Sequence, residues 1–433
     1  MSSPTGYRHA GDYNLEYCTL ILSDGTNVDM KGIAPEINIF QELSSHYMTC
    51  AIVVDDASNI IGGLSQDEYI GGINGVGIIV MRFGTTDEEG KNHKPIELVF
   101  AIYKVTNRAR LKEKEETYTL HGISQEAYAT KSRKISRAYG KNGGGLISNM
   151  ITGIHKEFFN TKKPIEVDST KGLHKYVIPY MSVDDTIELM RIEAVSDSRT
   201  PYYFFYETFE GFKFKDLNNL VRSDVTEKYK YLPFNYEVVD KDNNESDAVS
   251  IMSFSIKTGK DYLSKIENGH FKSKTLNIDL LRKNTRVVNF DYEKNFKNIN
   301  TFSKKKFLST DVSNDARYIM MSSRTGHDND LIMASESHVP KKINETKSLR
   351  NAYREIIFNQ MVSIVIPGDS NINVGQVIEV EIPPATIKDD KEQDKKADKY
   401  LSGKFLVARV RHKMQNETYT TEIDCVRDAG DQL

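Results

Sequence analysis

The stretch NQMVSIVIPGDSNINVGQVIEVEIPP, residues 359–384, has the pattern of a β-strand, a turn and a second strand. β-Branched residues fill its first half, Gly and Asp follow at a turn, and apolar residues return after Val-Gly. Residues 46–59, HYMTCAIVVDDASN, repeat the first half of this pattern. Met48 and Met361 stand at the start of the two strands, and Asp56 and Asp369 stand in the two turns. The chain therefore contains one strand-and-turn pattern twice.

The match continues in the same order beyond this first element. Val-Gly pairs ending at Gly77 and Gly375 each precede a strand-like run. A further strand then leads into a basic turn, in FAIYKVTNRARLKEKE and in FLVARVRHKMQN, and both copies finish with ETYT, which contains Tyr118 or Tyr419. Elements in one order across about 70 and about 60 residues predict a duplicated β unit. The alternative is that unrelated antiparallel strands share a vocabulary of Val, Ile, Thr and Gly-Asp turns.

The composition is that of a folded chain with more than one core. A length of 433 residues predicts about two to four domains. Apolar residues make up 39% and charged residues 27%, which excludes a disordered chain. The formal net charge of −3 gives no overall positive field for wrapping duplex nucleic acid.

The cysteines and the N-terminal residues indicate in which cellular compartment the chain folds. Cys18, Cys50 and Cys425 all lie in strand-like runs, and a sparse, odd count predicts buried reduced thiols rather than a disulfide framework. The N-terminus lacks a basic region followed by an apolar core, and no run of about 18 apolar residues occurs. We expect folding in the cytoplasm and no direct membrane insertion.

The element patterns predict an α+β chain that is mostly β. Residues 13–125 read as strands, residues 145–159 and 182–195 as helices, and residues 345–360 as a helix. Residues 248–269 are expected to supply the first strand of the late copy. The predicted domains are a first β domain (1–130), a mixed α/β domain (131–240), a second β domain split into 241–275 and 345–433, and an irregular inserted domain (276–344).

Several stretches resemble chemical sites without completing one. GKNGGG, residues 140–145, lacks the Lys-Ser/Thr ending of a phosphate loop, and GGINGVG, residues 71–77, has the wrong order for a dinucleotide fingerprint. Residues 327–330, HDND, lack the later Glu of a calcium loop, and the ten histidines show no zinc spacing. No Gly-x-Ser-x-Gly elbow is present. The sequence thus predicts no catalytic, cofactor-binding or metal-binding residue.

Two further patterns have simpler structural explanations. The acidic pairs Asp55-Asp56 and Asp184-Asp185 are expected at a strand end and a helix cap rather than across a catalytic cleft. The aromatic run 202–206 could offer a stacking face for bases or sugars. Because its rings alternate to both sides, we expect instead a strand buried on both faces.

The order of these segments resembles the central baseplate hub protein of T-even-like contractile-tailed phages. The resemblance rests on residues 31–61, 100–141, 200–214, 362–384 and 398–414, and is weakest at 225–344. It implies two related β-barrel tube domains per chain and a trimer whose six such domains form a pseudo-sixfold ring. With two copies in each chain, one trimer would match a sixfold tail tube on one face and a threefold spike on the other. The longer charged loop at 388–399 and the long opening before Tyr13 depart from the family.

The resemblance also implies partners and a role. The partners are the chain itself as a homotrimer, a trimeric spike protein, tail tube or tube-initiator proteins, a tape measure protein and the surrounding baseplate wedge proteins. DNA would pass through the ring transiently and without sequence recognition, and the chain would be a structural component of the virion. No enzyme activity and no cofactor are implied.

Two alternatives remain open from the sequence. One is the hub of a bacterial contractile injection machine; because few residues follow Cys425, we expect any spike to be a separate polypeptide. The other is a surface carbohydrate-binding or carbohydrate-hydrolysing protein built from β domains. That alternative requires an exposed aromatic cleft lined by carboxylates.

Overall fold

The computed structural model of the chain describes most of its length. The described residues are 11–23, 25–57, 77–86, 92–112, 115–140, 145–197, 200–231, 249–258, 262–279, 283–295, 300–302, 318–322, 340–384, 397–398, 401–416 and 418–428. The Gly-rich segments 58–76 and 141–144, residues 327–330 and most of the charged loop 388–399 lie outside this set. The sequence-based interpretations of those stretches therefore remain predictions.

The first β unit alternates buried and exposed residues along its strands, which is the pattern of a half-buried sheet. In β4, for example, Cys50, Ile52 and Val54 are buried, with more exposed residues between them. The strands of this unit are β1 (Tyr13–Ile21), β2 (Asn27–Asp29), β3 (Glu36–Glu42), β4 (Thr49–Asp56), β5 (Ile78–Thr86), β6 (Asn92–Lys112) and β7 (Glu115–Ser124).

The mixed unit contains the two predicted helices. Ser182 caps α3 because its hydroxyl accepts the N–H of Asp185, and Ile187 and Met190 face the core. The elements are α1 (Gln125–Lys131), β8 (Lys134–Tyr139), α2 (Ile147–Phe158), β9 (Ile165–Val167), β10 (Tyr176–Ser182), α3 (Val183–Glu193), β11 (Tyr203–Thr208), β12 (Gly211–Asp216) and α4 (Leu217–Arg222).

The second β unit draws its strands from two separate stretches of the sequence. β15 pairs with β19 although the insertion separates them, so residues 248–269 do supply a strand to the late copy. The strands of this unit are β13 (Val225–Tyr231), β14 (Ser250–Ile251), β15 (Ser253–Thr258), β19 (Gln360–Pro367), β20 (Val377–Glu381), β21 (Gly403–Gln415) and β22 (Thr418–Arg427).

The insertion is less irregular than the sequence indicates. Its strands β16, β17 and β18 form a sheet of their own, with β16 in the centre. Short, interrupted apolar runs concealed these strands. The elements are α6 (Tyr262–Glu267), β16 (Lys272–Asp279), β17 (Asn284–Asp291), α7 (Tyr292–Asn295), β18 (Tyr318–Ser322) and α8 (Pro340–Ile357), which delivers the chain to β19.

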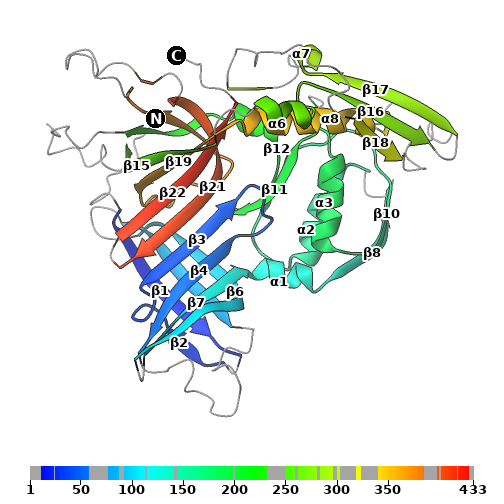
Figure 1. The fold of residues 1–433 in the computed structure, drawn as a ribbon. Helices are drawn as coiled ribbons and strands as arrows, with labels where there is room; N and C mark the ends of the chain where they lie inside the picture. Colours follow the sequence, from blue (N-terminus) through cyan, green and yellow to red (C-terminus); the bar gives the residue numbers. More distant parts are fainter. Residues whose placement is uncertain are drawn as a thin grey trace.

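One sequence-based boundary and the predicted pair of barrels need correction. β13 pairs with β20, so the sheet of the second unit begins at Val225, inside the segment assigned to the mixed domain. The described strands also do not close into two separate barrels. Strands of both units belong to one 14-stranded sheet, in which β3 and β4 of the first unit run beside β21 and β22 of the second (Figure 1).

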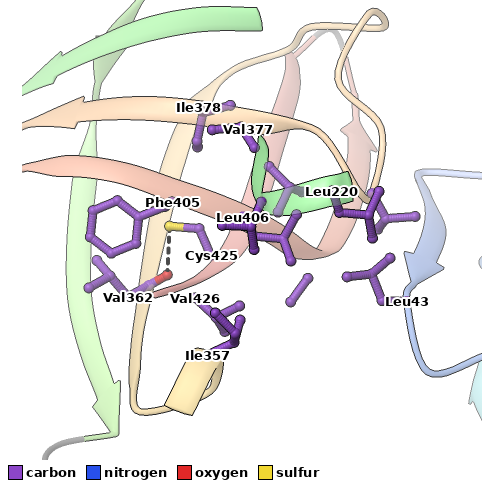
Figure 2. Close-up of a cluster of buried hydrophobic side chains, with 14 of the residues drawn as sticks. Leu43, Leu220, Ile357, Val362, Val377, Ile378, Phe405, Leu406, Cys425 and Val426 are labelled. Carbon is purple, nitrogen blue, oxygen red and sulfur yellow. Dashed lines mark hydrogen bonds between the residues drawn. The ribbon is translucent and has the colours of Figure 1, made fainter. Parts of the chain in front are cut away.

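Three hydrophobic cores stabilise the units. One lies mainly in the first β unit and includes Met414 and Tyr419 of the second, one lies mainly in the mixed unit, and the largest joins the second β unit to α8 and the insertion. Figure 2 shows the last of these, where Val377 and Ile378 of β20 pack near Phe405 and Leu406 of β21. The Cys425 thiol lies in this core and donates to the Val362 carbonyl at 3.2 Å.

Candidate functional site: the seam between two β units

One run of strands passes through both β units. Its order is β6, β7, β4, β3, β21, β22, β19 and β15. The two units meet where β3 pairs antiparallel with the second half of β21, from Arg409 opposite Glu42 to Gln415 opposite Glu36. We call this pairing the seam. β20 occupies the same side of β21 only as far as Leu406, which leaves the rest of that side for β3.

The seam buries the apolar and amide side chains at its centre. Ile39 of β3 is 0% exposed, and Val410 of β21 is 1% exposed. Gln41 is also buried, and its amide nitrogen donates to Asn373 Oδ1 at 3.0 Å while its amide oxygen accepts the N–H of Val374 at 3.2 Å. These contacts fix the turn after β19 against the first unit.

The outer face of the seam carries ion pairs that cross it. Arg409 lies 2.6 Å from Glu42, Arg411 lies 3.5 Å from Glu36, and Lys413 lies 3.7 Å from Glu36. All these side chains are partly exposed to solvent, so each pair contributes at most about 1 kcal/mol. The pairs instead fix the register, because a shift of one residue would move the cations to the other face.

The two β units share their internal pairing around one bulge, although β6 has two further register shifts beyond Thr106. Each has a bulge at the same place, at Tyr103 in β6 and at Ala408 in β21. Matching rows of paired residues cross the two units just before these bulges. The rows are Ile39, Cys50, Gly122 and Ile102 in the first unit, and Ile256, Val362, Cys425 and Val407 in the second.

We call the residues that mark the repeat the signature: Met48, Asp56, Gly77 and Tyr118 in the first copy, and Met361, Asp369, Gly375 and Tyr419 in the second. Those of the first copy lie in or beside its strands. Met48 is buried just before β4 and donates its N–H to Glu207 Oε2 at 3.0 Å. Asp56 ends β4 and lies near the Tyr118 hydroxyl; burial raises the pKa of Tyr118, and the Asp56 carboxylate raises it further. Gly77 accepts the N–H of Ile102 just before β5.

Those of the second copy lie at similar places. Met361 is the second residue of β19, and Asp369 lies in the turn after it, where burial raises the pKa of its carboxyl. Gly375 has φ +84°, and a Cβ there would occupy the place of the Tyr206 hydroxyl. Tyr419 in β22 is buried, and its hydroxyl lies 2.8 Å from His412 Nδ1.

The matched rows place the signature residues in equivalent strands but not at equivalent positions. Because Cys50 corresponds to Val362, Met361 corresponds to Thr49 rather than to Met48. The signature therefore does not converge on one site. The seam residues were missed by the sequence reasoning, although alternating charges in RVRHK, residues 409–413, signal a strand with one solvated face.

A buried charge cluster lies between the first β unit and the mixed unit. The Lys163 ammonium is 2.6 Å from Glu207 Oε1 and 3.1 Å from Glu126 Oε2. Burial raises the pKa of Glu207, and Lys163 offsets only part of that rise. Burial also acts to raise the pKa of Glu126, but Lys163 and the Ser124 and Thr161 hydroxyls outweigh it and hold that pKa below its usual range.

The remaining sequence candidates have structural roles. Asp55 and Asp56 end a strand, and Asp184 and Asp185 lie in the first turn of α3. The aromatic strand β11 is buried along its length, so it presents no exposed stacking face. All three cysteines are buried and unbonded to one another, and burial raises the pKa of each thiol.

The described residues show neither a metal-binding cluster nor a helix that could cross a membrane. They contain no group of three or more His, Cys, Asp or Glu side chains placed to hold a metal ion. Within the same residues, no helix is both long and apolar enough to cross a membrane.

Known structures share this fold, although sequence comparison finds no relative. No protein-family model matches the chain, and no curated protein matches it by sequence. The tail protein of Neisseria meningitidis MC58 aligns with a TM-score of 0.52 at 10% identity, over 96% of this chain and 97% of that one. The prophage MuSo2 43 kDa tail protein of Shewanella oneidensis aligns with a TM-score of 0.51 at 12% identity, over 96% of this chain and 100% of that one.

Proposed function

We propose that the chain is a structural, non-enzymatic component of a phage tail baseplate: a trimeric central hub. The observation that carries this proposal is the duplication within one chain of a β unit whose two copies pair edge to edge. Three such chains would supply six related units. A ring of this kind matches a sixfold tube on one side while keeping threefold symmetry for a spike on the other.

The shared fold supports the same assignment. Both structures named above are tail proteins, and each aligns with nearly all of this chain. The proposal extends from the fold to the partners that a hub needs: the trimeric spike, tail tube or tube-initiator proteins, the tape measure protein and the baseplate wedge proteins. The proposed location is the tail of the virion.

The solvated face of the strand run fits a channel for DNA. Arg411 of β21 lies 3.1 Å from Glu422 of β22, and Lys257 of β15 lies 2.7 Å from Asp424 of β22. Cations that are already paired hold phosphates weakly, whereas a continuous basic lining would retain DNA through counterion release. We propose that this face lines the channel and lets DNA pass without sequence recognition.

The carbohydrate alternative loses its main support. It required exposed aromatic side chains beside carboxylates, and Tyr203, Phe205 and Tyr206 are each at most 1% exposed. These rings pack in the cores of the mixed and second β units.

Solution mass tests the hub proposal. Light scattering of the purified chain, whose monomer mass is 49.3 kDa, should give about 148 kDa for a closed trimer. With the spike bound, the mass should exceed this value by the mass of the spike. The same sample imaged by electron microscopy should show a ring with a central opening. A monomer at every concentration, with and without the neighbouring tail proteins, would contradict the proposal.

A further inference from the structure

Both ends of the strand run have open edges. β5 pairs with β6 only as far as Ala101, so no described strand pairs with that side of β6 between Tyr103 and Lys112. At the other end, β15 pairs with β19 alone among the described strands. Open edges with unpaired backbone groups are sites where another strand adds.

These open edges correspond to the two sides of the seam. The matched bulges make β6 the counterpart of β21, and the matched rows make β15 the counterpart of β3. In the seam, β21 and β3 pair with each other. At the ends of the run, their counterparts have no such partner among the described strands.

Exposure at matched positions shows what the missing partner would cover. Ile39 in β3 is 0% exposed, whereas its counterpart Ile256 in β15 is 53% exposed. Val410 in β21 is buried, whereas its counterpart Val105 in β6 is only partly buried. Equivalent positions are therefore buried where the seam is filled and exposed where it is open.

Large exposed apolar side chains gather at the same edges. Tyr103 and Leu111 on β6 are 58% and 62% exposed, and Met252, just before β15, is 53% exposed. A soluble chain rarely exposes such residues on two matched open edges unless another surface covers them. The complementarity of the two edges identifies that surface as a second copy of this chain.

We propose that β15 of one copy pairs antiparallel with the second half of β6 of the next copy, which repeats the seam between molecules. This inference rests on the proposed function and deepens it, because it names the strands that join the copies. Transferring the seam register, in which Lys413 lies opposite Asn38, places Ala109 opposite Ser255 of the neighbouring copy. The contact is head to tail, so it can close into a ring.

The contact between copies differs chemically from the seam within the chain. The cations of β6 are paired with acids of its own unit: Arg108 with Glu116 at 2.7 Å and Lys112 with Glu115 at 2.8 Å. Near its start, β15 offers the exposed Met252 and Ser253 rather than carboxylates. Backbone pairing and apolar contact hold the copies together, so association should persist between about 0.1 M and about 1 M salt.

Site-directed cross-linking tests the pairing. The chain carrying both Ala109→Cys and Ser255→Cys should form an intermolecular disulfide under mild oxidation, and closed rings should appear as a covalent trimer on a non-reducing gel. The native cysteines are buried, so they add no background. Each single-cysteine variant is the matched control, because one exposed thiol cannot link a chain head to tail.

A second pair of variants tests the same contact without cysteine chemistry. Ile256→Lys should weaken self-association by at least about tenfold, measured by sedimentation, because it places a charge in the proposed contact. Val177→Lys is the matched control, since Val177 is 81% exposed and lies on β10, far along the chain from either edge. Ile256 is already 53% exposed, so the monomer should fold normally.

The outcomes separate this inference from the proposed function. Cross-linked trimers and weaker association of the Ile256 variant support the pairing. A native trimer by mass that neither cross-links nor responds to Ile256→Lys overturns the pairing and leaves the hub proposal standing. A wild-type chain that stays monomeric under all conditions overturns both.

Discussion

Replacing Lys163 with Met should destabilise the junction between the first β unit and the mixed unit. Its ammonium is the cation between the carboxylates of Glu207 and Glu126, at 2.6 Å and 3.1 Å. The Glu207 side chain is 0% exposed and the Glu126 side chain 9% exposed. Methionine keeps the length of the side chain and removes the charge, so the two carboxylates would face each other without compensation.

The magnitude follows from the separation and the burial. At an effective dielectric constant of about 20, opposite charges about 3 Å apart attract by roughly 5 kcal/mol. Much of that attraction offsets the cost of removing the ions from water. Removing one partner of a buried pair leaves the desolvated charge behind, which typically costs about 3–5 kcal/mol. We expect a loss in this range.

The loss should depend on pH with a definite sign. Burial already raises the pKa of Glu207, and without Lys163 that pKa rises further. A carboxyl whose pKa is higher in the folded state than in the unfolded state lowers stability as pH rises between the two values. The deficit of the variant should therefore be larger at pH 8 than at pH 5, where Glu207 takes up a proton.

Because the protein has several units, the stability loss of the Lys163 variant is best measured locally, by hydrogen exchange. The amide of Met48 donates to Glu207, so its opening free energy should fall with the junction, alongside the urea midpoint by circular dichroism. Adding Glu207→Gln to the variant should restore most of the loss, because the amide oxygen still accepts from Met48. A loss below about 1 kcal/mol, or equal losses at both pH values, would refute the reasoning.

Three further predictions concern single positions. Burial raises the pKa of Asp216 to about 7, so the stability of the wild-type chain should fall as pH rises from about 4 to about 7. The Asp216→Asn variant should lose this pH dependence and should have a higher melting temperature than the wild type at pH 8, as measured by calorimetry. Ile39→Ala should lower the free energy of unfolding by about 3 kcal/mol in urea, and Ile256→Ala in the isolated chain by less than about 1 kcal/mol; equal losses would contradict the burial difference. Gly122→Ala should lower the free energy of unfolding by about 2 kcal/mol, since the new Cβ would lie 2.6 Å from the Cys50 sulfur. Adding Cys50→Ala should restore most of this loss in the same urea assay.

Local patterns in the sequence predicted most of the individual elements. The helical spacing of Ile187 and Met190 identified α3, and the cap at Ser182 identified its start. The pattern of the opening stretch identified β19 and the turn at Asp369. Such elements depend on residues close in sequence, so one chain is enough to reveal them.

The relation between distant elements could not be predicted in the same way. The partner of Ile39 across the seam is His412, and no local signal connects two residues so far apart. Aligning Met48 with Met361 gave the right strands with a shift of one residue, because strands of Val and Ile read alike at either shift. The bulges at Tyr103 and Ala408, which fix the true match, have no distinctive residue type.

The contact between Gln41 and Asn373 has a consequence for what kind of object the chain can build. Copies joined head to tail form a finite disc only when each step turns by a whole fraction of a circle; any other step produces an endless helical fibre. Within the chain, the buried amide of Gln41 sets that step, since it holds both Asn373 and Val374. In the proposed ring, loosening this contact would preserve every strand pairing and would favour fibres over closed discs.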